Sequence, residues 1–421
     1  MDEEGKRREA IAMLQRGIAI QEICNKLGRS RQWLGKWRRR FEAEGEASLR
    51  GRSRAPRARP HATPERIVRA VTAARDRLGR RQGRRRFAGI GADAVAWELE
   101  LSGVRPLPAR RTLERILART GRTARAPRPV RPPAPRGYPA PPAKRGGDLQ
   151  QTDLVGPRHL RTASGPQRFY SFHTVDVAAG GTASFQFEDK SGESFCRYLI
   201  GCAWAKLGLP RIWQIDNETS VAGFERVGRV FTQPVRLALL LGVEVRFIPP
   251  GEPGRNADVE CFNALWQERV LRRFAAPGLG HLARVSARFE RWFMEERPHP
   301  KLSLAAHGTR FPGALLASLD GDIRTLPHRF TLQTYRDGLG ELRFPLARGR
   351  ISWVRRADEH GRLELLGHRL RLGRRATNEY LICTLSTARA ELTLQLDGRP
   401  IGAYRHPIDE KVIRPLVGRE G

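Results

Sequence analysis

A proline-rich, basic segment in the first half of the chain limits how the rest of the chain can fold. Residues 122–147 contain eight prolines and no acidic residue. A segment of this composition cannot bury a core and is typical of an extended linker. In polyproline geometry, at ~3.1 Å per residue, it would span on the order of 80 Å. The sequence therefore predicts separate folded parts before and after residues 122–147.

Positive charge is concentrated in the part of the chain that ends with this linker. The 421 residues carry a formal net charge of +33. Residues 1–147 hold 37 Lys and Arg against 14 Asp and Glu, a net charge of +23, and the remaining +10 falls on residues 148–421. A surface that only needs to be soluble would spread its charge out. Charge gathered in one third of the chain is typical of a protein that binds a polyanion.

Composition excludes several classes of protein. The mean hydropathy is −0.51, and the longest apolar stretch, residues 237–245, is far too short to cross a bilayer. The first ten residues are charged, which predicts no secretory leader. The five cysteines are odd in number and form no Cys-x-x-Cys pair, which argues against a disulfide framework and a structural zinc site. We expect a cytoplasmic protein without a membrane partner.

Residues 1–45 show the pattern of a helix-turn-helix. Two short apolar stripes separated by Gly17 predict two helices, and Ser30 is a plausible N-cap for a third. The third helix would bury Leu34, Trp37 and Phe41. Its outer face would carry the candidate DNA-binding residues Arg31, Gln32, Lys36 and Arg39. The alternative is a small helical bundle with a solvated basic face; we favour DNA binding because the basic face lies on the helix that would enter a groove.

A second helix-turn-helix-like unit is predicted over residues 63–121. Thr63, Pro64 and Glu65 together are typical of a helix start. The last helix, residues 108–120, would bury Leu113, Ile116 and Leu117 and expose three further candidate DNA-binding residues, Arg110, Arg111 and Arg115. This second unit is less sharply defined by its sequence than the first.

Residues 148–312 alternate between strand-like runs and amphipathic helices. Strands are predicted at 149–155, 168–177, 182–188, 211–215 and 243–248, and helices at 192–206, 231–241, 256–274 and 281–294. The order β-β-β-α-β-α-β-α is that of the α/β ribonuclease H-like fold. In that fold the first and fourth strands are neighbours.

Three acidic residues occupy positions from which they could converge in such a fold. Asp153 lies on the first strand, Asp216 closes the fourth, and Glu260 lies one turn into the helix after the fifth. Carboxylates at strand ends and on a facing helix can hold two divalent cations, an arrangement that makes and breaks phosphodiester bonds. Each acid alone could be a turn, cap or surface residue. Their joint placement favours a catalytic site.

Residues 326–421 contain short alternating runs, which predict a small β-barrel. The runs are residues 330–334, 349–354, 363–366 and 391–396. Asp397-Gly398 is a typical hairpin turn. The whole chain is thus expected to be multidomain, with all-α units first, an α/β core in the centre and a β-barrel last.

The central region, roughly residues 147–312, resembles the DDE transposase and retroviral integrase superfamily. The resemblance rests on Gln151-Thr152-Asp153, Asp216-Asn217, the run from Asn256 to Asn263, Arg297-Pro298-His299 and residues 308–312. The flanking plan is similar to that of bacterial insertion-sequence and Mu-like transposases. The resemblance implies that Asp153, Asp216 and Glu260 are the catalytic and metal-binding triad. It also implies two Mg²⁺ or Mn²⁺ ions as cofactors.

Four positions depart from the usual pattern of these families: Glu218, Ala257, Cys261 and Met294. None of them removes a metal ligand. The leading hypothesis is a transposase or integrase that binds element ends, cleaves them and joins them to target DNA. One alternative is a catalytically weak or inactive DNA-binding protein derived from a transposase, and another is a plain ribonuclease H-type nuclease.

The same hypothesis predicts the partners and the cellular location. The chain would bind double-stranded DNA, both element ends and target, and would act as a homo-oligomer on DNA. An ATPase partner protein is possible. The expected location is the bacterial cytoplasm, in association with the nucleoid.

Overall fold

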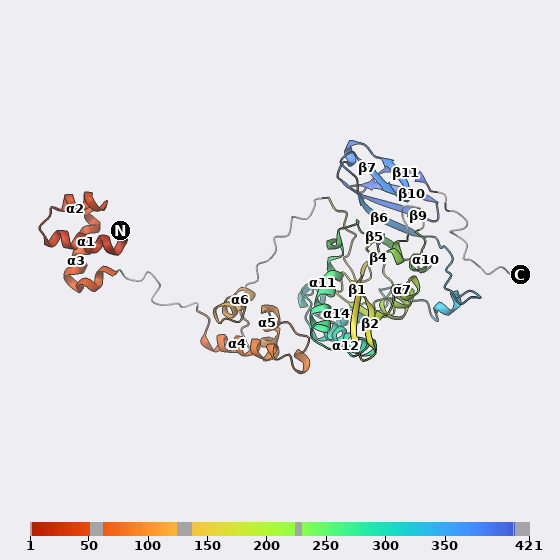
Figure 1. Cartoon of the computed structure of the whole chain (residues 1–421), viewed down its shortest axis with the longest axis horizontal. Coiled ribbons are helices and arrows are strands. Elements are labelled where there is room, and N and C mark those ends of the chain that lie inside the picture. The colour runs from red at the N-terminus through yellow and green to blue at the C-terminus, as the bar shows by residue number, and fades with distance from the viewer. Residues whose placement is uncertain (1, 51–61, 124–136, 224–229, 407, 409–421) are drawn as a thin grey trace. The chain divides into compact units, whose positions relative to one another are not determined.

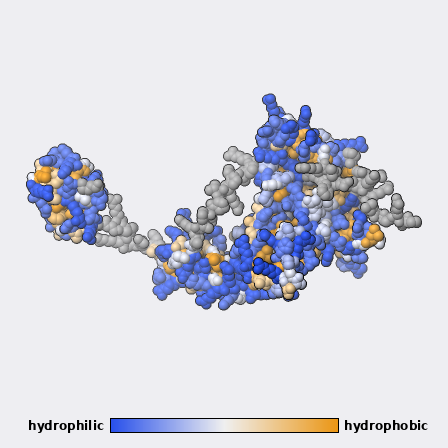
Figure 2. All heavy atoms as spheres, viewed as in Figure 1, coloured by the Kyte–Doolittle hydropathy of each residue, from blue (hydrophilic) through white to orange (hydrophobic). Residues whose placement is uncertain are grey.

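The computed structural model describes residues 2–50, 62–123, 137–223, 230–406 and 408. Its internal contacts divide the chain into two compact units, Met1–Val68 and Arg69–Gly421 (Figure 1). Half of the expected linker at 122–147, residues 124–136, lies outside the described residues. On the face drawn in Figure 2, hydrophilic residues cover most of the surface of each unit.

The first unit is made of short helices that meet at turns encoded in the sequence. Gly28 ends the second helix in the left-handed conformation, with φ 59°. Ser30 caps the third helix as expected, because its side chain accepts a hydrogen bond from the backbone N of Trp33 at 3.2 Å. The elements are α1 (Glu3–Gln15), α2 (Ile20–Leu27), α3 (Arg31–Glu44) and the 3₁₀ turn η1 (Glu46–Arg50). Leu34 and Trp37 are buried as predicted, whereas Phe41 is only partly buried.

The helices that follow, as far as residue 121, surround a buried carboxylate. They are α4 (Glu65–Gly79), the short 3₁₀ turn η2 (Gly83–Arg85), α5 (Ala92–Leu101) and α6 (Arg110–Arg119). The side chain of Glu98 on α5 is 3% exposed and is neutralised by Arg77 at 3.2 Å and Arg85 at 2.6 Å. A buried acid with two guanidinium partners fixes α5 against the end of α4 and the turn after it.

A mixed sheet forms the centre of the second unit. Its first five strands are β1 (Leu149–Thr162), β2 (Gly165–Asp176), β3 (Thr182–Phe187), β4 (Ile212–Ile215) and β5 (Glu244–Phe247), in the order β3-β2-β1-β4-β5. β1, β2 and β3 are antiparallel, whereas β1, β4 and β5 are parallel. The predicted contact between the first and fourth strands is confirmed, with Thr152 opposite Ile215.

Helices cover both faces of this sheet. Phe172 of β2 packs with Phe195 and Tyr198, whereas Phe169, three residues earlier, packs with Phe262 and the other helical residues of a second cluster. Side chains of opposite parity along a strand point to opposite faces, so these are two separate layers. The helical elements are α7 (Gly192–Tyr198), η3 (Leu199–Ala203), α8 (Trp204–Leu207), α9 (Thr219–Ala222), α10 (Gln233–Leu240), η5 (Pro253–Asn256), α11 (Ala257–Trp266), η6 (Gln267–Leu271), α12 (Leu279–Arg291), η7 (Trp292–Glu296), α13 (Leu304–His307) and α14 (Pro312–Ser318). None of the helices in the described ranges is both long enough and apolar enough to cross a bilayer.

The C-terminal strands extend the central sheet, which corrects the expectation of a separate small barrel. β6 (Arg350–Arg356) pairs in parallel with β5, and β9 (Tyr380–Ser386), β10 (Glu391–Leu396) and β11 (Arg399–Arg405) continue the sheet to its edge. Only β7 (Arg362–Leu365) and β8 (His368–Arg371) form a sheet of their own within the described residues. The predicted turn at Asp397-Gly398 is confirmed, because both residues have positive φ between the paired strands β10 and β11.

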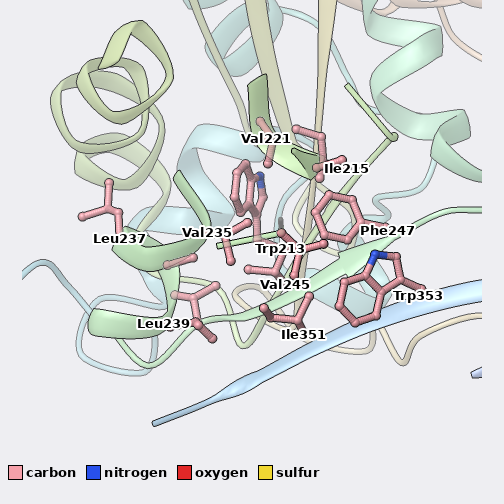
Figure 3. Close-up of a cluster of buried hydrophobic side chains, with 14 of the residues drawn as sticks. Trp213, Ile215, Val221, Val235, Leu237, Leu239, Val245, Phe247, Ile351 and Trp353 are labelled. Atoms are coloured by element: carbon pink, nitrogen blue, oxygen red, sulfur yellow. The ribbon is translucent and has the colours of Figure 1, made fainter. Parts of the chain in front are cut away.

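A shared apolar core explains this continuity. The Trp353 ring on β6 stacks on the Phe247 ring of β5, with centroids 5.9 Å apart, and both side chains are fully buried (Figure 3). Pairing with β6 also covers the edge of β5, which would otherwise expose unpaired backbone groups. One predicted strand, residues 330–334, is wrong: the 3₁₀ turn η8 (Leu332–Tyr335) occupies most of this region.

Candidate functional site

The two candidate aspartates lie side by side where β4 ends beside β1. Asp153 is on β1, and Asp216 directly follows the last residue of β4. Because Thr152 is opposite Ile215 in the parallel pairing of β1 with β4, the next residue along each strand is one of the two aspartates. Adjacent strands are ~4.8 Å apart, so the chain topology brings the two carboxylates to one edge.

Two glutamines hold the start of α11 over this edge. The side-chain oxygen of Gln151 accepts hydrogen bonds from the backbone N of Asp258 at 3.1 Å and of Val259 at 3.3 Å. The side-chain nitrogen of Gln214 donates to the carbonyl of Arg255 at 2.9 Å. Glu260 follows within the first turn of α11, and the helix start is thereby tied to both aspartate-bearing strands.

The sequence analysis named Gln151 within a motif but did not predict that these two glutamines hold the start of α11. Each stands two positions before an aspartate, in Gln151-Thr152-Asp153 and Gln214-Ile215-Asp216. Residues two apart on a strand point to the same face, so a repeated Gln-x-Asp pattern places an amide beside each carboxylate. The repetition was visible in the sequence and could have identified them.

Burial raises the pKa of each of the three candidate acids, and neighbouring carboxylates add to the rise. Burial, together with the nearby charges of Asp216 and Glu260, raises the pKa of Asp153 to about 7. The pKa of Asp216 is raised by burial and by the charge of Glu218, and that of Glu260 is raised by burial and by the charge of Asp216. In the absence of a cation, these surroundings therefore favour the neutral form of the three acids more than water does.

A buried chain of hydrogen bonds orients Asp153. The side-chain nitrogen of Asn263 donates to Oδ2 of Asp153 at 2.6 Å, so the Asn263 oxygen is free to accept from Nδ1 of His173 at 2.5 Å. Nε2 of His173 then accepts from the hydroxyl of Ser171 at 2.7 Å. That hydroxyl in turn accepts from the side-chain amide of Gln186 at 2.9 Å. Burial lowers the pKa of His173 to about 4, so its ring is neutral and its proton is fixed on Nδ1.

The remaining acids near the site have partners that explain them structurally. Asp176 accepts from the backbone N of Gly147 and of Ala179, each at 2.8 Å. Asp258 pairs with Lys301. Glu218, one of the departures from the family pattern, binds Lys190 at 2.8 Å.

The neighbouring amide Asn217 also has fixed partners. Its side-chain nitrogen donates to the Ile248 carbonyl, and its oxygen accepts from the guanidinium of Arg355.

The candidate DNA-binding residues are all exposed, as predicted. They are Arg31, Gln32, Lys36 and Arg39 on α3, and Arg110, Arg111 and Arg115 on α6. Arg31 is engaged by the side-chain oxygen of Gln21 at 2.8 Å, and Arg110 forms an ion pair with Asp93 at 3.3 Å. Lys36 lies beside the ring of Trp37 at 5.6 Å.

The N-terminal part of the chain matches a known family of DNA-binding folds. Residues 7–67 match the family described as winged helix-turn-helix. The chain contains a helix-turn-helix. The prediction for the first unit is therefore confirmed in its fold, and the match continues through residues 51–61, which lie outside the described part of the chain.

Solved structures show a weaker likeness to this chain. The simian T-cell lymphotropic virus intasome in complex with the PP2A regulatory subunit B56 gamma is 16% identical, with a TM-score of 0.34, over 54% of this chain and 70% of that one. The HTLV-2 integrase catalytic core domain in complex with magnesium is 11% identical in its dimeric form, with a TM-score of 0.29, over 38% of this chain and 93% of that one. Its trimeric form is 12% identical, with a TM-score of 0.30, over 41% and 97%. So distant a likeness assigns no activity to this chain.

Proposed function

We propose that this protein is a DDE-type polynucleotidyl transferase that binds DNA, cleaves it and joins the cut end to a second DNA. The observation that carries the proposal is the meeting of Asp153, Asp216 and Glu260, from three separate elements, in one partly buried and strongly acidic place. The strand order β3-β2-β1-β4-β5 supports a ribonuclease H-like core beneath them. The sequence motifs resemble those of bacterial insertion-sequence and Mu-like transposases, so we propose an enzyme of that type.

The donor set suits hard divalent cations. A bound cation would stabilise the ionised form of these three partly buried carboxylates, and Mg²⁺ prefers oxygen ligands. Within the described residues no three His, Cys, Asp or Glu side chains stand close enough to enclose one metal ion. Mg²⁺ is commonly held by one or two carboxylates together with water and substrate phosphates, so a closed protein cage is not required. Asp153, Asp216 and Glu260 would share two Mg²⁺ or Mn²⁺ ions.

The chain's own residues prepare the site for an in-line transesterification. Gln151 and Gln214 fix the helix that carries Glu260, and Asn263 fixes the Asp153 carboxylate through Oδ2. Two bound divalent ions would supply activation of a water or DNA 3′-hydroxyl and stabilisation of the leaving oxygen. One phosphodiester is broken and one is formed in strand transfer, so the reaction needs no ATP and no covalent protein intermediate.

The helical units would provide the affinity for DNA. In a helix-turn-helix the second helix of the motif enters the major groove, and here that helix is α3, with the exposed residues Arg31, Gln32, Lys36 and Arg39. Arg110, Arg111 and Arg115 would add contacts from α6. We propose the same parts as the sequence analysis: a helix-turn-helix at 1–45, a second such unit at 63–121, a linker at 122–147 and a catalytic core at 148–312. The location would be the bacterial nucleoid.

A homo-oligomer is the arrangement that strand transfer favours. Joining two element ends to one target requires at least two active sites in a fixed relation, and closed symmetric assemblies provide one. Sedimentation of the protein with duplex DNA from the ends of its element tests this: a complex with a single chain per pair of ends would contradict it. A need for an ATPase partner would appear as joining that occurs only when a second protein and ATP are added.

A second candidate is a catalytically weak DNA-binding protein derived from such an enzyme. The ion pair between Lys190 and Glu218 favours this second candidate. It holds the Lys190 ammonium near Asp216, and a metal ion would have to compete with that ammonium for the Asp216 carboxylate. An assay with Mg²⁺ and labelled duplex DNA taken from the sequences that flank the coding region separates the candidates. Joined products support the transferase, nicks alone indicate a nuclease, and binding without cleavage indicates the DNA-binding derivative.

A further inference from the structure

A cavity of about 720 Å³ lies in the second unit, between the segment around α5 and the end of α12. Its lining includes Gly89, Trp97, Arg269, Trp292, Arg297 and His299. None of the three candidate catalytic acids is among the described residues that line it. The cavity is therefore separate from the acidic site.

A buried guanidinium without a full set of partners lines this cavity. Arg269 lies on η6, is 8% exposed, and packs over the Trp292 ring at 5.3 Å. Neither Nε nor Nη1 of Arg269 has a hydrogen-bond partner among the described residues. Buried N–H groups are nearly always satisfied in proteins, and a buried cation is costly without a counter-charge. These two donors indicate a missing acceptor.

Three of the acids near Arg269 are paired with other cations. Glu98 is held by Arg85 at 2.6 Å and by Arg77, and Asp93 is 3.3 Å from Arg110. Glu268, the neighbour of Arg269 in sequence, pairs with Arg273 at 2.7 Å. The lining also includes Glu295 and Glu296, whose side chains are exposed to solvent. Arg269 thus lacks a dedicated carboxylate partner in the described structure.

A second guanidinium reinforces the positive charge of the cavity. Arg297 also lines it and lies over the Phe293 ring at 4.7 Å. Burial, and then the charge of Arg297, lowers the pKa of Arg269 to about 10, so Arg269 remains charged at neutral pH. A Cβ atom at position 89 would lie only 3.1 Å from Nη2 of Arg269. Because residue 89 is a glycine, the space beside the guanidinium stays open. The cavity combines two cations, free donors and space.

We propose that this cavity binds a phosphate group through Arg269 and Arg297. The planar fork of a guanidinium matches a phosphate oxyanion in a bidentate manner, and the tetrahedral group can meet two such forks at once. The group could belong to the backbone of bound DNA or to a small phosphate-bearing molecule. The proposal does not depend on the catalytic role of the acidic triad.

The test uses full-length, metal-free protein and inorganic phosphate as the probe. Thermal unfolding is followed at pH 7.5 as phosphate replaces chloride at constant ionic strength. Wild-type protein should gain a saturable rise in Tm, because a ligand that binds the folded state alone stabilises it. Arg269→Gln should lose most of that rise. Arg272→Gln, an exposed position three residues further along the chain, should retain it. In chloride, Arg269→Gln should unfold no earlier than wild type, because it removes a buried charge that has no dedicated carboxylate partner.

An equal phosphate-dependent rise in wild type and Arg269→Gln would overturn the proposal. If Arg269→Gln fails to fold, Arg297→Gln provides the same comparison, with the same criterion. Duplex DNA then distinguishes the two sources of phosphate. If DNA supplies the group, Arg269→Gln should lower the slope of log affinity against log salt by about 1. If a small molecule supplies it, that slope is unchanged while the response to inorganic phosphate is lost.

Discussion

Asp153 should make the stability of the metal-free protein depend on pH. Its pKa is raised from 3.8 to about 7 in the folded state, mainly by burial. Between pH 4 and pH 7 the folded chain therefore holds a proton that the unfolded chain has lost, so the free energy of unfolding falls as pH rises through this window. We predict a lower Tm at pH 8 than at pH 5.5 in EDTA.

Asp153→Asn isolates this contribution from those of the other acids. The uncharged amide should flatten the decrease in Tm, and Mg²⁺ at pH 8 should restore Tm in wild type but much less in the variant. Asp176 titrates in an overlapping range, with a pKa raised to about 6 by burial, and it stays intact in both proteins. The same decrease in Asp153→Asn as in wild type would contradict the assignment.

Asn263 should act as a positioning residue for Asp153. Removing its amide in Asn263→Ala frees Oδ2 of Asp153 and interrupts the chain to His173. We predict a roughly 10–100-fold loss of joining activity or metal affinity, as is usual when a residue that orients a metal ligand is removed. The Mg²⁺ concentration for half-maximal activity should rise while DNA binding is unchanged. A loss of folding, seen by circular dichroism, with no shift in metal requirement would indicate a structural role only.

At the residue scale, the sequence alone identified the acids but not what holds them. Asp153, Asp216 and Glu260 were found because strand ends and a helix start are visible as local patterns. The links from Asn263 to His173, and from Gln151 to the start of α11, join residues roughly ninety or more positions apart. No local periodicity encodes such contacts.

On the helix α3, Lys36 is the cleanest probe of DNA recognition. Its ammonium is exposed, whereas Arg31 must first release Gln21 before it can contact a base. Lys36→Ala should weaken binding to the specific DNA site by ~1–3 kcal/mol if the side chain reads a base edge. Arg16→Ala, an exposed basic position at the end of α1, is the matched control. Equal losses in both variants, measured by competition against random duplex, would argue against a specific contact.

Because β6 pairs with β5, we predict that the central and C-terminal strands unfold together as one cooperative unit. The sequence suggested two separate domains. Trp353→Ala leaves a cavity against Phe247 in the shared core and should cost ~3–5 kcal/mol of unfolding free energy. Denaturant unfolding of residues 137–421 should then shift as a single transition that includes the central strands. A variant that loses only a separate C-terminal transition would support an independent barrel.

Element boundaries were easier to predict than partners. Most of the central helices and strands begin and end close to their predicted bounds, because local burial dictates the apolar periodicity. The exceptions are β1, which ends at Thr162 and not at residue 155, and α9, which was not predicted. Periodicity does not say which strand pairs with β5, and the pairing with β6 depends on contacts such as Val245 opposite Ile351. Residues 330–334 alternate like a strand, but most of them belong to the 3₁₀ turn η8, and they pair with none of the strands in the described ranges.

For the whole molecule, the proposed function assigns DNA binding to the helix-turn-helix in the first unit and chemistry to the acidic site in the second. Positive charge is concentrated before the central sheet, with a net +23 in residues 1–147, a range that includes the first unit and the helices α4 to α6. Affinity for DNA should therefore survive the loss of the acids, and catalysis should not. Variants of the three acids can therefore be tested for DNA binding and for catalysis in separate assays.

The decisive measurement is strand transfer by single-residue variants of the full-length protein. Duplex DNA from the sequences flanking the coding region is incubated with a supercoiled plasmid and Mg²⁺ or Mn²⁺. Asp153→Asn, Asp216→Asn and Glu260→Gln should each bind the duplex as wild type does and yield no joined product. Asp258→Asn, two residues from Glu260 on the same helix and paired with Lys301, should remain active. Joining at the wild-type level by Glu260→Gln would contradict the account.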